Sequence, residues 1–170
     1  MKITLAYIIL LVITSSFTDS SANKPFKLDV SEFPKVKLVN ITNEKQTLLY
    51  DELMQPYVLR IFNQKGIEIE SFDSRSTMKY DNTIRKNMFQ DISPNESISL
   101  PQTIITKVSN DYLIEANAFQ FKSLEPGTYN AVIEWTSAID IYFDEQTSQN
   151  IKKDVWMGSV VSDKITFTLE

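Results

Sequence analysis

Strict alternation of apolar and polar side chains near the end of the chain constrains its fold more than any other feature. In residues 129–135, one face of an extended chain would carry Tyr129, Ala131, Ile133 and Trp135. Residues 165–169 repeat this pattern with Ile165, Phe167 and Leu169. A period of two residues is typical of a β-strand with one buried face. The last third of the chain is therefore predicted to form strands that cover an apolar core.

Short segments rich in β-forming residues recur along the rest of the sequence. They are predicted as strands at residues 36–41, 47–50, 57–62, 67–71, 97–100, 104–108, 112–116, 119–121 and 156–162. Pro101 should end the strand before it or place that strand at a sheet edge. Many short strands with little helical periodicity indicate an antiparallel sandwich or barrel. The chain has only three glycines, whereas a closed barrel needs glycines or bulges at its corners. We therefore predict a single all-β sandwich domain over residues 36–170.

Residues 73–93 carry no clean period. The spacing of Tyr80, Ile84 and Met88 would suit one face of a helix. A long loop with a short helix or an irregular strand fits the same residues equally well. Both alternatives stay open for this segment.

The first 22 residues have the layout of a secretory signal peptide. Lys2 precedes an apolar run over residues 3–13, and small residues follow, ending at Ala22. The run is about half the roughly 20 residues that a membrane-spanning helix needs. A cleaved signal at residues 1–22 is therefore favoured over a membrane anchor, with a buried N-terminal helix or strand as the alternative. Residues 23–35 would form a polar leader or a first edge strand, and the mature chain would be secreted or periplasmic.

Two short patterns resemble the immunoglobulin-like domains of bacterial secreted proteins of unknown activity. The first is Leu124-Glu125-Pro126-Gly127-Thr128-Tyr129, and the second runs from Trp156 through Gly158 and Ser162 to Ile165 and Phe167. The resemblance implies an immunoglobulin-like antiparallel β-sandwich, but no particular function. Proline and glycine suit a type II turn, and the following Tyr129 would hydrogen-bond the turn backbone as a tyrosine corner. Tyr129, Trp135, Trp156 and Phe167 are interpreted as core or corner residues.

Missing residue types exclude most catalytic chemistry. The chain contains no histidine and no cysteine. The commonest general base and the His-dependent nucleophile systems are therefore absent, as are the usual ligands of zinc, copper and iron–sulfur clusters. A carboxylate pair or a Ser–Lys arrangement would remain, but neither shows a recognisable motif. We expect no enzymatic activity and no cofactor. Because the net charge is −5, binding to nucleic acid is not expected either.

One late loop combines apolar and acidic residues. Ile139, Ile141, Tyr142 and Phe143 form a possible contact surface, or an extension of the preceding strand through a bulge. Asp140, Asp144 and Glu145, with Asp154 beyond them, are candidate ligands for calcium, which prefers hard oxygen donors. Their spacing differs from the calcium-loop pattern, so a solvated acidic loop is the simpler interpretation.

These features favour a secreted or periplasmic binding module over an enzyme. Its partner would be a protein or a cell surface, because loops at the ends of a sandwich are common binding sites. Two alternatives remain open at this point. One is a carboxylate enzyme that acts on extracellular glycans, and the other is a sandwich that inhibits proteinases. A structural subunit that pairs through a strand edge is a third possibility.

Overall fold

A computed structural model describes residues 24–50, 57–73, 83–116 and 119–170. The expected signal peptide at residues 1–22 lies outside this described part of the chain, and so does Tyr80. The described residues form fifteen strands and one short 3-10 turn, with no α-helix among them. The elements are β1 (Phe26–Asp29), β2 (Lys37–Asn40), β3 (Gln46–Leu49), β4 (Val58–Phe62), β5 (Phe72–Asp73), η1 (Lys86–Met88), β6 (Phe89–Ile92), β7 (Ser97–Ser99), β8 (Thr103–Val108), β9 (Asp111–Ala116), β10 (Phe119–Leu124), β11 (Gly127–Ser137), β12 (Ile141–Asp144), β13 (Gln149–Lys152), β14 (Gly158–Val161) and β15 (Ile165–Leu169).

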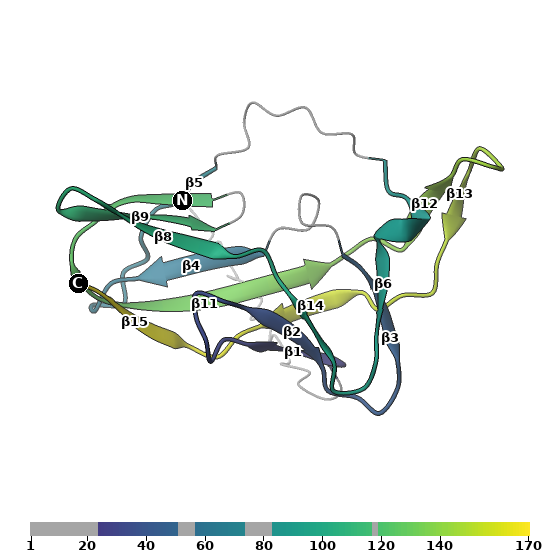
Figure 1. Cartoon of the computed structure of the whole chain (residues 1–170), viewed down its shortest axis with the longest axis horizontal. Coiled ribbons are helices and arrows are strands. Elements are labelled where there is room, and N and C mark those ends of the chain that lie inside the picture. The colour runs from purple at the N-terminus through teal and green to yellow at the C-terminus, as the bar shows by residue number, and fades with distance from the viewer. Residues whose placement is uncertain (1–23, 51–56, 74–82, 117–118) are drawn as a thin grey trace, which may run out of the picture.

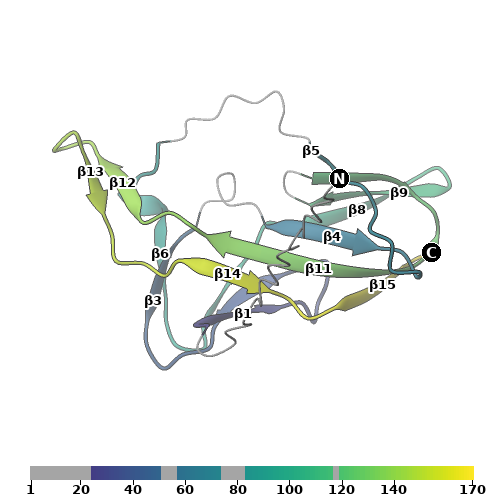
Figure 2. The same cartoon turned by 180° about the vertical axis from the view of Figure 1, so that it is seen from behind.

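Strand β11 organises the largest part of the fold, and it crosses the middle of the molecule in both Figure 1 and Figure 2. One edge of β11 pairs with β4, while β15 and β14 pair with successive parts of its other edge. Ser162 bridges the gap between β15 and β14. Its N–H donates to the carbonyl of Ile133 at 2.8 Å, and its Oγ accepts from the N–H of Ile133 at 3.0 Å. The second pattern of the resemblance thus forms one interrupted edge strand.

The other strands form four further antiparallel sheets. Their orders are β1-β2-β7, β5-β10-β9-β8, β3-β6 and β12-β13. One apolar cluster joins residues from the three larger sheets, with Trp135, Tyr57, Phe26 and Phe121 as its largest fully buried side chains. The chain is therefore all-β, with several antiparallel sheets around a shared core, which is consistent with a β-sandwich.

Tyr57 carries a polar group into this core. Its hydroxyl shares a hydrogen bond with the hydroxyl of Thr103, which is also fully buried. Burial raises the pKa of Tyr57 above its ordinary value, although the bond to Thr103 opposes this shift. The pair joins β8 to the residue that precedes β4. A buried hydroxyl without such a partner would be costly.

The expected hydrogen bond from Tyr129 to the turn backbone is present, but the type II turn is not. The hydroxyl of Tyr129 donates to the carbonyl of Glu125 at 2.8 Å, and burial raises the pKa of this tyrosine. Gly127 has φ 158°, far from the roughly +80° that a type II turn requires at this position. The left-handed residue is instead Ser123, with φ 56°, at a register shift between β9 and β10. Ser123 therefore marks a bulge within β10, and the chain bends between β10 and β11 at Glu125 and Pro126, next to the expected proline–glycine pair.

One expected strand is absent, and one of the two alternatives left open for residues 73–93 agrees with the structure. Residues 67–71 form no regular strand; Ile67 and Ile69 make single backbone hydrogen bonds to the region of β4. In the described part of residues 73–93, Ile84 lies outside any helix or strand and Met88 ends the short turn η1, so these residues do not share an α-helix. Among the described residues of this region, η1 is followed by the short strand β6, whose end residues Phe89 and Ile92 are buried.

Candidate functional site

The late loop with mixed apolar and acidic residues folds into a hairpin that projects from the rest of the molecule (Figure 1, at the upper right). Strands β12 and β13 pair from Ile141 opposite Lys152 to Asp144 opposite Gln149. Asp144 holds the tip closed, since its carboxylate accepts from the N–H of Gln146 at 3.1 Å and the hydroxyl of Thr147 at 2.9 Å. The hairpin is a separate two-stranded unit and does not extend β11, which ends at Ser137.

The following contacts attach this hairpin to residues 84–89, the segment that leads into β6 and includes its first residue. The N–H of Phe143 donates to the carbonyl of Ile84 at 2.8 Å. The ring of Tyr142 meets Phe89 edge to face, with centroids 6.1 Å apart. Arg85 and Glu145 form an ion pair at 3.3 Å. An isolated two-stranded hairpin is marginally stable in water, so these contacts fix its position.

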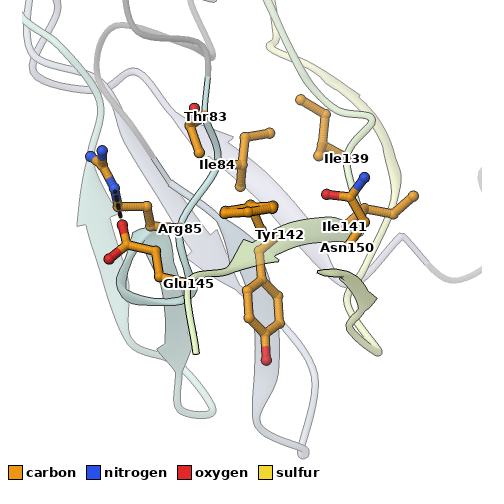
Figure 3. Close-up of a pocket in the computed structure, with 9 residues that line it drawn as sticks. Thr83, Ile84, Arg85, Ile139, Ile141, Tyr142, Glu145 and Asn150 are labelled. Atoms are coloured by element: carbon orange, nitrogen blue, oxygen red, sulfur yellow. Dashed lines mark hydrogen bonds and ion pairs between the residues drawn. The ribbon is translucent and has the colours of Figure 1, made fainter. Parts of the chain in front are cut away.

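An open hollow of about 590 Å³ lies between the hairpin and this segment (Figure 3). Its apolar lining comes from Ile84, Ile139, Ile141 and Phe143, and the remaining lining residues are Thr83, Arg85, Tyr142, Glu145 and Asn150. In Figure 3 the Arg85–Glu145 pair closes one side, with Ile139, Ile141 and Asn150 at the other. The arrangement is an apolar surface with a polar rim.

The expected contact residues divide between the two faces of the hairpin. Ile141 and Phe143 lie on the exposed face, where they are 46% and 37% exposed, and Ile139 is half-buried beside them. The ring of Tyr142 packs on Phe89 on the other face, although Tyr142 also borders the hollow. Of the four predicted residues, Ile139, Ile141 and Phe143 therefore form the apolar wall, while Tyr142 anchors the hairpin.

The acidic residues do not converge. Asp140 pairs with Lys152 at 3.1 Å, Glu145 pairs with Arg85, and Asp144 bonds its own turn. Throughout the described chain, no three acidic side chains gather in a way that could hold a metal ion. The structure therefore does not bring Asp140, Asp144 and Glu145 together as one group of ligands, since each carboxylate contacts a different partner.

Sequence reasoning missed Ile84 and Arg85. They precede the hairpin by more than fifty residues and lie in the segment without a clean period. Their role depends on one long-range backbone bond, from Phe143 to Ile84, and such a pairing leaves no local signal. Asn150 was also missed, because it faces the hollow only once β13 pairs with β12.

Removing the anchor should loosen the hairpin selectively. We expect Tyr142→Ala to speed the hydrogen exchange of the amides in β12 and β13, since the ring contact with Phe89 holds the hairpin in place. Amides of β11, inside the core, should exchange as before. Hydrogen-exchange mass spectrometry measures both. An equal change in β11 would show that Tyr142 supports the whole fold instead.

The described residues contain no helix with the length and apolarity required to cross a membrane. No protein-family model matches the sequence, and searches among curated proteins and solved structures returned no match.

Proposed function

We propose that this chain is an exported, non-enzymatic binding module that docks a protein partner on the β12–β13 hairpin. The observation that carries the proposal is the exposure of Ile141 and Phe143 on one wall of the hollow. Apolar residues gathered on a projecting element and surrounded by polar groups are typical of interaction sites. The partner is proposed to contribute an apolar segment that fills the hollow.

The energetics favour a modest affinity. Fully burying a side chain such as isoleucine or phenylalanine contributes about 1.5–3 kcal/mol. Ile141 and Phe143 are already more than half buried, so each has only part of that energy left to contribute. Association also costs translational and side-chain entropy. A short peptide is therefore expected to bind in the micromolar range or more weakly, on the order of −8 kcal/mol at most.

The rim charges restrict the chemistry of the partner. Arg85 is bonded to Glu145, and Lys152 is bonded to Asp140. Both pairs balance their charges, so the hollow gives no strong attraction to either sign. A charged group placed against Ile141 and Phe143 would lose its hydration without gaining a partner. An uncharged apolar segment fits best.

Export and immunoglobulin-like character are parts of the proposal that rest on the sequence. Export is supported by Lys2, the apolar run at residues 3–13 and the small residues that end at Ala22. The immunoglobulin-like assignment is supported by the hydrogen bond from Tyr129 to Glu125, a feature of such sandwiches. Both agree with a module that meets its partner outside the cytoplasm.

The alternatives find less support at this site. A glycosidase uses two carboxyl groups on either side of the scissile bond, whereas the lining of the hollow supplies one, Glu145, which is bonded to Arg85. A proteinase inhibitor that binds like a substrate would present an extended segment for strand pairing. The hairpin tip is instead closed by Asp144, and Ser148 has φ 52°.

A peptide-display experiment tests the proposal. A random peptide library displayed on phage is selected on the immobilised mature chain, and enriched peptides are synthesised and titrated. We expect apolar, uncharged sequences to be enriched. Phe143→Asp should weaken their binding at least about tenfold, because it removes apolar contact and places a carboxylate in the hollow.

Ile67→Asp is the matched control. Ile67 is 60% exposed and lies outside the lining of the hollow, so this variant should bind the peptides like the unaltered chain. The proposal fails if no peptide is enriched above a blank surface. It also fails if Phe143→Asp and Ile67→Asp weaken binding equally.

A further inference from the structure

Strand β8 presents an unpaired edge at the border of the four-stranded sheet. It has six residues, the most of any edge strand in the described chain, and it pairs with β9 without a register shift. Within that part of the chain, no backbone group makes a hydrogen bond to the outer side of β8. A long, regular, uncovered edge is a template for pairing with another strand.

The turn after β8 determines which backbone groups point outward. Val108 and Asp111 pair across a two-residue turn in which Ser109 has φ 59°. The two residues that flank such a turn form backbone hydrogen bonds to each other. Along an antiparallel strand, the backbone N–H and C=O groups of successive residues point alternately toward the paired strand and away from it. The N–H and C=O groups of Ile105 and Lys107 therefore point away from β9.

The side chains of β8 leave this edge accessible. Ile104 and Val108 are each 52% exposed on the outer face, with the exposed Thr106 between them. Lysine side chains often protect free edges, but Lys107 is engaged elsewhere. Its Nζ donates to the carbonyl of Glu170 at 3.0 Å and lies 5.5 Å from the ring centroid of Tyr112.

We propose that β8 pairs antiparallel with β8 of a second copy, about a two-fold axis through Thr106. The outward groups of Ile105 in each copy would bond those of Lys107 in the other, which gives four backbone hydrogen bonds. This register places Ile104 opposite Val108 of the second copy and the two Thr106 side chains opposite each other. Pairs of β-branched residues and threonine pairs are favourable across strands. The single charge on the strand, Lys107, faces Ile105 and not another lysine.

The pairing would join two four-stranded sheets into one continuous sheet. The β8–β9 turn lies at one end of the molecule and the β12–β13 hairpin lies toward the other (Figures 1 and 2). A two-fold axis at β8 would therefore direct the two hairpins to opposite ends of the dimer. The proposed interface is separate from the hollow, so it does not depend on the proposed function.

Sedimentation velocity over a concentration series tests the pairing. The mature chain is expected to pass from monomer to dimer between about 5 and 500 μM, because a single strand edge forms a small interface. Thr106→Asp and Thr106→Lys should each raise the dissociation constant at least tenfold, since like charges would face each other across the axis. An equimolar mixture of the two variants should restore the dimer.

Gln64→Asp and Gln64→Lys serve as controls for a change of charge at an exposed site far from β8 in the sequence. Both should dimerise like the unaltered chain. The proposal is overturned if the chain stays monomeric at the highest concentration. It is also overturned if either Thr106 variant dimerises as tightly as the unaltered chain, or if mixing them restores nothing.

Discussion

Trp135→Ala is expected to lower the free energy of unfolding by about 3–5 kcal/mol, the range measured when large buried aromatic residues are truncated. Trp135 is 1% exposed and lies on β11, which pairs with three other strands. Its ring stacks on Trp156 with centroids 5.8 Å apart, and Trp156 meets Phe26 edge to face at 5.2 Å. The truncation would leave a cavity at the junction of two sheets.

Urea denaturation followed by far-ultraviolet circular dichroism measures this loss without relying on tryptophan fluorescence. Because domains are stabilised by only about 5–15 kcal/mol, the variant should melt roughly 10 °C or more below the unaltered chain. Met157→Ala is the control, since Met157 is 50% exposed and its loss should cost less than about 0.5 kcal/mol. A cost below about 1 kcal/mol for Trp135→Ala would contradict the described packing.

The packing of Trp156 explains part of the second sequence pattern, which runs from Trp156 through Gly158 and Ser162 to Phe167. The ring of Trp156 lies directly over Gly158, where an added Cβ would be 2.8 Å from Cζ2 of the indole. A glycine two residues after the tryptophan is therefore required by the close approach of the ring. The later Ser162 bonds both backbone groups of Ile133. Gly158 and Ser162 of this sequence pattern thus have specific structural roles.

The late strands were predictable because each has one face in the core. In β11, Ala131, Ile133 and Trp135 are buried, and the residues between them are not. The hairpin was not predictable in this way. Ile141, Tyr142 and Phe143 are consecutive apolar residues without alternation, because both faces of β12 carry apolar contacts. One face lines the hollow and the other packs on Phe89.

The candidate site was therefore only partly visible in the sequence. The apolar residues of the late loop drew attention to Ile139, Ile141 and Phe143, since such residues are unusual in a loop that only contacts solvent. The opposite wall of the hollow, which contains Ile84, was not visible in the sequence. It is brought into place by the long-range backbone bond from Phe143 to Ile84. Contacts between segments distant in sequence depend on tertiary packing, which local propensities do not encode.

Asn40→Asp is expected to destabilise the fold strongly although it changes almost no volume. Asn40 is fully buried, and its Nδ2 donates to the carbonyls of Glu44 at 2.8 Å and Ile92 at 2.9 Å. Its Oδ1 accepts from the N–H and the hydroxyl of Thr42. The substitution replaces the donor by an oxygen that faces two carbonyls. Placing an uncompensated charge there should cost about 3–5 kcal/mol near neutral pH.

The cost should fall as the pH is lowered. Burial and the two facing carbonyls raise the pKa of the introduced carboxyl above its unfolded value of about 3.9. Below the unfolded pKa the group is protonated in both states, and the protonated form donates one hydrogen bond. The stability that the variant has below the unfolded pKa is therefore lost as the pH rises through the pKa of this carboxyl in the folded state.

Urea denaturation at pH 4 and pH 7 measures this dependence for Asn40→Asp and for the exposed control Asn95→Asp. The control should cost less than about 1 kcal/mol at either pH. Equal losses in the two variants, or a loss for Asn40→Asp that does not grow with pH, would contradict the buried role of this amide. Since Asn40 joins the end of β2 to the carbonyl of Ile92 in β6, the result also tests how the hairpin-bearing end of the molecule is tied to its core.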